Sequence, residues 1–167
     1  MPADGPAARI GVDAVRTARL ARAGRADELV ARAVLNPREL RWALAHPASP
    51  VRLAAGIALK EAAIKCAGGR RPNFTWHDIR IDPIRTHRCG CGARADALIE
   101  GLFTGRPRSA SVRAPGVGPC CPAQSGASAA WGCGAGLVVA VVLGRDPRQA
   151  AAPAESADID TEGSTTC

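Results

Sequence analysis

The segment Ser49–Cys66 constrains the fold more than any other part of the chain, because helix-end signals bound it on both sides. It opens on a capping serine followed by proline, and Gly68-Gly69 beyond it is typical of a helix end. Apolar residues recur along it at Val51, Leu53, Ile57, Leu59 and Ile64. This pattern predicts a well-buried helix. The charged residues that stand out within it are Lys60, Glu61 and Lys65.

The chain before this helix carries further signals. A short strand is predicted at Ala8–Val12, and a helix from about Ala14 to Leu35, with an interruption at Gly24. The apolar face of that helix is expected to include Leu29, Val30, Ala33 and Val34. Asn36-Pro37-Arg38-Glu39 then has the pattern of a capping box with proline at the first helical position. A second, short helix is predicted there, ending before Pro47.

Two segments after the central helix read as strands. Phe74–Asp82 alternates in polarity, and on this strand His77 is expected to be hydrogen-bonded and partly buried. Leu137–Leu143 is strongly apolar. Trp42 and Trp76 are most simply interpreted as core or interface residues.

The rest of the second half has little pattern. Residues 84–134 are rich in Gly, Pro, Cys, Arg and Ser and have little periodicity, so the region is interpreted as divergent and its structure stays open. From Arg145 onward the composition predicts a disordered tail. The domain is therefore expected to span residues 1–144 and the tail residues 145–167.

Charge and hydropathy indicate which classes of binding partner and which cellular location suit the chain. A formal net charge of +7 suits phosphorylated ligands or acidic proteins. A nucleic-acid partner is disfavoured, because the arginines are scattered and aromatic residues make up only 3% of the chain. No secretory signal is visible, and the apolar run Ala135–Leu143 is too short to span a membrane. A cytoplasmic protein without membrane contact is expected.

The seven cysteines form no obvious scaffold. An odd number without a signal peptide argues against a disulfide framework. His87-Arg88-Cys89-Gly90-Cys91 and Cys120-Cys121 have the residue types of zinc ligands, but the spacing is not the usual one. Reduced thiols in a loop are the favoured interpretation.

Two short motifs contain residue types that bind metal ions and phosphate groups. Gly11-Val12-Asp13 places a carboxylate at the end of the first strand, and Glu61 and Lys65 share one face of the central helix. Mg²⁺ is often bound by one or two carboxylates together with substrate phosphates, and a lysine beside them can neutralise phosphate charge. The residues alone leave simpler alternatives open. Asp13 would then cap the next helix, and Glu61 and Lys65 would form a surface ion pair.

The order of these motifs resembles the bacterial holo-acyl-carrier-protein synthase family. That family begins with a Gly-Ile/Val-Asp strand, continues with Arg-x-Leu-Thr-x-x-Glu-Leu and then has a Lys-Glu-Ala-x-x-Lys helix. Here the three segments are Gly11-Val12-Asp13, Val34–Leu40 and Lys60–Lys65. The segment Phe74–Ile81 is similar to the next strand of the family. The resemblance covers about residues 8–82.

The resemblance implies an α+β fold, with a small antiparallel sheet packed on helices, and a 4'-phosphopantetheinyl transferase activity. Asp13 and Glu61 would bind Mg²⁺, Glu61 and Lys65 would be catalytic, and Lys60, Lys65 and Arg52 would contact coenzyme A. A serine of an acyl or peptidyl carrier protein would attack the β-phosphate and release adenosine 3',5'-bisphosphate. The pathway, in fatty-acid or other synthesis, stays open. The family also implies a homotrimer.

Three positions depart from the family pattern. Ala33 stands where the second segment of the family begins with arginine. Gly56 stands where an arginine usually precedes the helix lysine, and Arg52, one turn earlier, is either a substitute for it or an ordinary solvated residue. Trp131 stands where the family has a histidine before its last strand. Two other hypotheses therefore remain beside an active enzyme. One is a degenerate relative that only binds coenzyme A or a carrier protein. The other is a basic nucleic-acid-binding module, which would bind with strong salt dependence.

Overall fold

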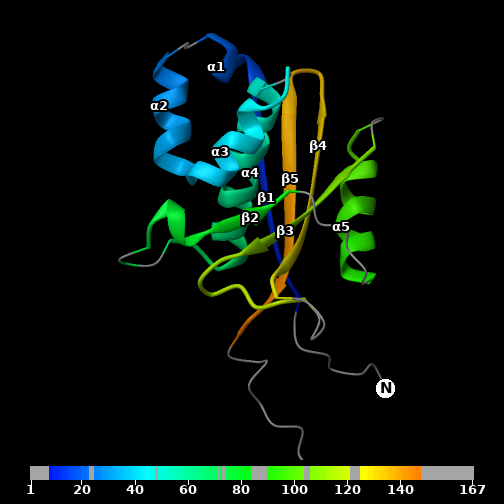
Figure 1. Ribbon diagram of the computed structural model, residues 1–167. Coiled ribbons are helices and arrows are strands. Elements are labelled where there is room, and N and C mark those ends of the chain that lie inside the picture. Colours follow the sequence, from blue (N-terminus) through cyan, green and yellow to red (C-terminus); the bar gives the residue numbers. More distant parts are fainter. Residues whose placement is uncertain are drawn as a thin grey trace, which may run out of the picture.

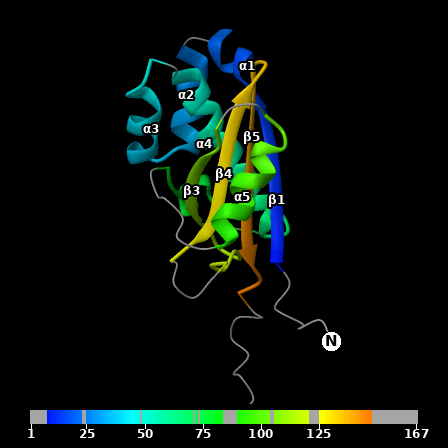
Figure 2. The ribbon, with the colours of Figure 1, turned by 90° about the vertical axis from the view of Figure 1, so that its right-hand side faces the viewer.

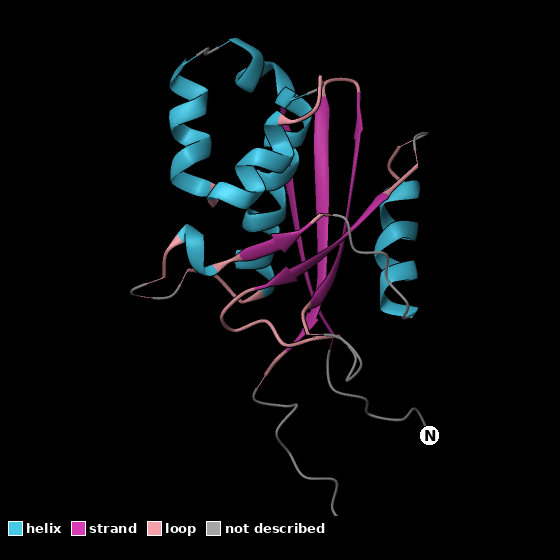
Figure 3. Ribbon diagram, viewed as in Figure 1, coloured by secondary structure: helices cyan, strands magenta, loops and turns pink. Residues whose placement is uncertain are grey.

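A five-stranded antiparallel sheet lies between two layers of helices in the computed structural model (Figures 1 and 3). The structure describes residues 8–22, 25–47, 49–70, 72, 74–83, 90–103, 106–120 and 125–147. The strand order is β1-β5-β4-β3-β2. The elements are β1 (Ala8–Arg16), α1 (Thr17–Arg22), α2 (Arg25–Val34), α3 (Pro37–Leu44), α4 (Ser49–Cys66), η1 (Trp76–Asp78), β2 (Arg80–Asp82), α5 (Gly90–Glu100), β3 (Arg108–Arg113), β4 (Ala127–Gly134) and β5 (Leu137–Arg145). The predicted α+β class is confirmed.

The central helix α4 has the predicted bounds, Ser49–Cys66. It ends where Gly68 and Gly69 adopt positive φ values of 88° and 111°, which a glycine adopts without strain. The amide of Gly69 donates to the carbonyl of Ile64 at 2.9 Å, so the last turn is closed by a backbone hydrogen bond. Most of the helix is buried against β1 and β5. A charged residue on its buried side must therefore be paired within the protein.

Strand β1 is longer than predicted. It pairs with β5 from Ala8 opposite Arg145 to Arg16 opposite Leu137, and only then does α1 begin, at Thr17. The apolar strand β5 supplies partners along this whole length, so β1 does not stop at Val12. Asp13 therefore lies inside the strand, opposite Ala140, and is not a helix cap.

The predicted helix over residues 14–35 is two helices, α1 and α2, and Gly24 lies outside the described residues. Its predicted apolar face is partly wrong. Leu29 and Val30 are 68% and 50% exposed, whereas Val34 is buried. The reason is that α2 packs against α3, α4 and η1 through the side that carries Ala31 and Val34.

The short helix α3 begins as predicted. The side-chain oxygen of Asn36 accepts hydrogen bonds from the amides of Arg38 and Glu39, both at 3.0 Å. Glu39 closes the capping box by accepting from the amide of Asn36 at 2.9 Å. The helix ends at Leu44, before Pro47, as expected.

The predicted strand Phe74–Asp82 is mostly wrong, because only Arg80–Asp82 pairs in the sheet. The carboxylate of Asp78 accepts hydrogen bonds from the amide and hydroxyl of Thr75, at 2.8 and 2.9 Å, and this closes the 3₁₀ turn η1. These bonds also lower the pKa of Asp78. His77 lies in the turn and is exposed, contrary to the prediction.

The region 84–134, whose structure the sequence left open, contains α5, β3 and β4 in its described parts. Helix α5 lies over β4 and β5 (Figure 2). Its residues Ala95 and Ile99 are buried in the core on that side of the sheet. At Gly132 of β4 an added Cβ would lie 2.5 Å from a methyl carbon of Ile99, so glycine permits this close packing. Alanines and glycines form much of this core, which is why hydropathy gave little periodicity.

Two remaining expectations concern the chain end and the membrane. Arg145 belongs to β5 and does not begin the tail, whereas residues 148–167 lie outside the described part. Among the described helices, none is both long and apolar enough to cross a bilayer.

Candidate active site

Strand β1 touches the backbone of α4 at Gly11. A Cβ atom added there would lie 1.9 Å from the carbonyl oxygen of Ala62 and 2.5 Å from the amide nitrogen of Cys66. Glycine is therefore required by the close approach of strand and helix. Arg9, two residues earlier, contacts the carbonyl of Ala67 at 3.4 Å, so β1 runs antiparallel to α4. Asp13, two residues later, reaches the same turn of the helix, between Ala62 and Cys66.

Asp13 meets Lys65 at that turn. The Nζ atom of Lys65 donates to Oδ1 of Asp13 at 2.8 Å. The side chain of Asp13 is 17% exposed and that of Lys65 is 54% exposed. Glu61 is half-buried one helical turn before Lys65, on the same side of α4. Three of the five predicted site residues thus gather at the contact between β1 and α4.

We expect Gly11→Ala to separate β1 from α4 and to lower the free energy of unfolding by about 1–3 kcal/mol, the usual cost of overpacking. Chemical denaturation of the wild type and the variant would measure this change. Gly90→Ala is the matched control, because an added Cβ at Gly90 meets no atom within 4 Å. Equal stability of the two variants would contradict the close approach at Gly11.

Lys60 is not at this site. It is fully buried, and its Nζ donates to the carbonyls of Val34 at 2.8 Å and Trp76 at 2.9 Å and pairs with Oε2 of Glu39 at 2.7 Å. Burial lowers the pKa of Lys60, and the Glu39 carboxylate partly offsets this effect. All three donors of the ammonium group are used by the protein. The prediction that Lys60 contacts coenzyme A is therefore wrong, since its role is structural.

Glu39 has a role that sequence reasoning missed. Besides the capping box and the Lys60 pair, its Oε1 accepts from the amide of Ile81 at 2.7 Å. It is only 2% exposed and joins α3, α4 and β2. The capping pattern identified Glu39 in the sequence, but a capping residue is normally exposed, and nothing in the pattern indicated its burial.

Arg52 is also remote from Asp13. Its Nη1 donates to the carbonyl of Trp42 at 3.1 Å, and its guanidinium lies 5.3 Å from the centroid of the Trp42 ring. At about 100° per residue, Arg52 and Glu61 lie on opposite sides of α4. At Gly56 an added Cβ would lie 2.9 Å from Leu35, so Leu35 occupies the space of a larger side chain. Arg52 therefore does not replace the family arginine near the carboxylates.

Trp131 fills the core instead of lining an open site. It is 2% exposed, and its ring packs edge-on against Trp42 at a centroid distance of 6.3 Å. Asp13 and Trp131 are both opposite Ala140, so they lie on the same face of the sheet, two strands apart. The indole Nε1 has no hydrogen-bond partner in the described part of the chain.

The segment that contains this site matches a family model. The model describes the 4'-phosphopantetheinyl transferase superfamily, and it matches residues 9–109. The chain belongs to this superfamily. The matched residues include Asp13, Glu61 and Lys65.

Solved structures of similar fold agree with this membership. The holo-[acyl-carrier-protein] synthase of Neisseria meningitidis is 23% identical with a TM-score of 0.54, over 83% of this chain and 98% of that one. The Helicobacter pylori synthase, solved with coenzyme A, is 20% identical with a TM-score of 0.53, over 80% and 96%. The Plasmodium yoelii synthase is 16% identical with a TM-score of 0.50, over 81% and 92%. No curated protein sequence matches the chain.

The carboxylates of Asp13 and Glu61 are too few to hold Mg²⁺ by themselves, so a phosphorylated ligand is needed to complete a Mg²⁺ site. No group of three His, Cys, Asp or Glu side chains that could hold a metal occurs among the described residues. Asp13 and Glu61 offer two hard oxygen donors, and Mg²⁺ commonly takes one or two carboxylates while substrate phosphates and water complete its shell. The donor set therefore fits this metal. The four cysteines that the structure describes form no disulfide with one another, and Cys89, Cys121 and Cys167 lie outside the described residues.

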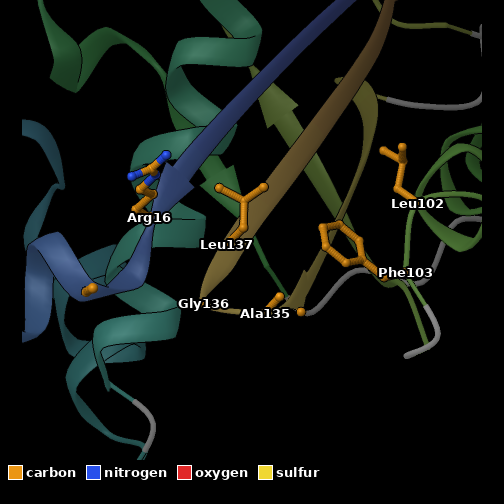
Figure 4. A pocket seen from close by; sticks show the side chains of 8 residues that line it. Arg16, Leu102, Phe103, Ala135, Gly136 and Leu137 are labelled. Atoms are coloured by element: carbon orange, nitrogen blue, oxygen red, sulfur yellow. The ribbon is translucent and has the colours of Figure 1, made fainter.

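A pocket of about 730 Å³ lies elsewhere, between the end of β1, the β4–β5 turn and the residues after α5 (Figure 4). Its described lining includes the apolar side chains of Leu102, Phe103 and Leu137, with Arg16 at the strand end. None of the described lining residues is acidic. It offers none of the carboxylate chemistry found at Asp13, and we do not assign the superfamily's reaction to it.

Proposed function

We propose that the chain transfers 4'-phosphopantetheine from coenzyme A to a serine of an apo acyl or peptidyl carrier protein, as a Mg²⁺-dependent enzyme of the holo-acyl-carrier-protein synthase type. The observation that carries the proposal is the contact of Asp13 with Lys65 beside Glu61, within the segment matched by the superfamily model. The H. pylori synthase of similar fold was solved in complex with coenzyme A, which supports this choice of donor. The net charge of +7 also suits an anionic donor and an acidic acceptor.

Each of the three residues has a role in this proposal. Mg²⁺, held by Asp13 and Glu61, would supply positive charge against the pyrophosphate of coenzyme A. Lys65, whose side chain is 54% exposed, is able to leave Asp13 and pair with a phosphate oxygen. Glu61, on the same side of α4 as Lys65, would accept the proton of the attacking serine.

The bond changes balance without a further reactant. The serine oxygen forms a bond to the β-phosphorus of coenzyme A, and the bond from that phosphorus to the bridging oxygen breaks. The bridging oxygen leaves on adenosine 3',5'-bisphosphate with the electron pair. The serine proton passes to Glu61 and then to water or product.

A degenerate relative that binds coenzyme A or a carrier protein without turnover is the second candidate. Two observations favour it. Leu35 packs against Gly56, where the family has an arginine, and Trp131 is buried where the family has a histidine. Neither replacement alters the Asp13–Lys65 contact, so we place the active enzyme first.

Other parts of the proposal rest on the family resemblance. They are a homotrimer, a cytoplasmic location and a carrier protein of fatty-acid or related synthesis. Exposed apolar side chains on the outer face of β1, Ile10 at 53% and Val12 at 42%, are compatible with coverage by another subunit.

Intact-mass spectrometry of the acceptor tests the proposed reaction. The purified chain is incubated with coenzyme A, Mg²⁺ and an apo acyl carrier protein, and the mass of the carrier is measured. A gain of one phosphopantetheine group is expected, and the Asp13→Ala, Glu61→Ala double variant should give none. A folded wild-type chain that modifies none of several carriers would overturn the transferase and leave the degenerate relative, for which binding of coenzyme A is then measured.

A further inference from the structure

Four arginines converge on a second pocket at the other edge of the sheet. We call it the arginine pocket and define it by Arg38, Arg41, Arg80 and Arg113. Its volume is about 450 Å³, and it opens between the start of α3 and the strands β2 and β3. Its other lining residues are Asn36, Pro37, His77, Ile81 and Asp82.

The charges of this pocket are poorly balanced. Asp82 is the one carboxylate in the described lining. Arg80 and Arg113 are directly opposite each other in the register of β2 and β3, and like charges in this arrangement destabilise a sheet. No ion pair of the four arginines with an acidic side chain occurs within the described chain. The pocket therefore holds an excess of positive charge that a bound anion would neutralise.

The donors that face this anion are guanidinium groups. The amides of Arg38 and Glu39 at the start of α3 already donate to Asn36, so the helix end contributes no free N–H from these two residues. Guanidinium groups present planar, paired donors that match phosphate oxygens in a bidentate manner. A neighbouring pocket of about 390 Å³ shares Arg80 and Arg113, and its lining also includes Ser125 and the carboxylate of Asp78. The capacity for more than one phosphate group therefore comes from the arginine pocket itself, where four guanidinium groups stand against one carboxylate.

We propose that the arginine pocket binds a small anion that carries two or more phosphate groups. This inference goes beyond the proposed transferase function. Strand β1, which bears Asp13, and strand β2 form opposite edges of the five-stranded sheet. At about 4.8 Å between neighbouring strands, the two edges are about 19 Å apart. The pocket is thus separate from the carboxylates of the candidate active site within one chain.

Isothermal titration calorimetry with inorganic tripolyphosphate tests this site. The full chain is titrated in EDTA without Mg²⁺, so that the carboxylate site has no metal. The pocket variant is Arg38→Gln with Arg80→Gln. The matched control is Arg94→Gln with Arg106→Gln, which removes the same charge from exposed residues outside the pocket. We expect the pocket variant to bind at least about tenfold more weakly than wild type, and the control to bind nearly as well.

Thermal unfolding provides a second readout. Tripolyphosphate should raise the melting temperature of the wild type and of the control but not that of the pocket variant. Without ligand the pocket variant should melt no lower than wild type, because it loses the Arg80–Arg113 repulsion. A Lys65→Ala variant should retain binding.

Three results would overturn the proposal. The first is no binding of tripolyphosphate by the wild type. The second is loss of binding in Lys65→Ala together with retention in the pocket variant, which would assign the anion to the candidate active site. The third is evidence for a general cationic surface. An equal loss in the pocket variant and the charge-matched control would provide it. Stronger binding of a short single-stranded DNA that displaces tripolyphosphate would provide it as well.

Discussion

Asp13→Asn should reduce the rate of carrier modification about a thousandfold, because a lost metal ligand removes several kcal/mol of transition-state stabilisation. Asparagine keeps the shape of the side chain but lacks the charge that attracts both Mg²⁺ and Lys65. The exposed ion pair with Lys65 contributes only about 0.2–1 kcal/mol to folding, so the melting temperature should change little. The rate is measured by intact mass of the carrier over a range of Mg²⁺ concentrations.

Glu100→Gln is the control for loss of a negative charge, because Glu100 is exposed at the end of α5, on the opposite face of the sheet from α4. It should keep the wild-type rate. If Asp13→Asn kept more than about a tenth of the wild-type rate, a loss of less than 1.4 kcal/mol, Asp13 would not be a metal ligand in the reaction. Intact transfer activity of that variant would leave the transferase proposal standing and shift the metal site elsewhere.

Lys60→Met should lower the free energy of unfolding by about 3–5 kcal/mol, the usual cost of removing one partner of a buried ion pair. Methionine fills most of the lysine volume, so the loss comes from charge and hydrogen bonding. It strands the Glu39 carboxylate and the carbonyls of Val34 and Trp76 in the core. Chemical denaturation followed by circular dichroism measures the change.

Lys65→Met is the matched control on the same helix. Lys65 is 54% exposed and its ion pair is open to water, so this substitution should cost no more than about 1 kcal/mol. The Lys60→Met, Glu39→Gln double variant should be more stable than the sum of the single changes predicts, because it removes both charges together. Equal costs for Lys60→Met and Lys65→Met would mean that Lys60 is not buried in solution.

The pH dependence of a Glu39→Gln variant follows from the same pair. The carboxylate of Glu39 raises the pKa of Lys60, so its removal lowers that pKa further below 10.5. Between the lowered folded value and 10.5 the unfolded chain binds more protons than the folded one. The free energy of unfolding therefore increases with pH up to 10.5 in both proteins, and the increase begins at a lower pH in the variant. Relative to wild type, the variant should gain stability between its own folded pKa and that of the wild type. Burial raises the pKa of Cys66 in both proteins, so this thiol cancels in the comparison.

Local signals in the sequence were sufficient for the helices with strong ends. The capping box at Asn36 and the Gly68-Gly69 pair predicted α3 and the end of α4, because these signals act through backbone hydrogen bonds within a few residues. They failed for β1 and β2. The length of β1 depends on pairing with β5 more than a hundred residues later, and the turn η1 depends on a Thr75–Asp78 contact inside an alternating pattern.

The sequence by itself determined which residues carry the superfamily's motifs, since the order of Asp13, Glu61 and Lys65 is a property of the chain. Only the tertiary structure gave Lys60 and Lys65 different surroundings and therefore different roles. The two lysines lie five residues apart on one helix. Lys65 contacts Asp13, because Gly11 lets β1 approach α4 closely. Lys60 is enclosed by Glu39 and two backbone carbonyls. Sequence spacing states which residues share a helix face, but burial depends on what packs against that face, and distant segments provide that packing.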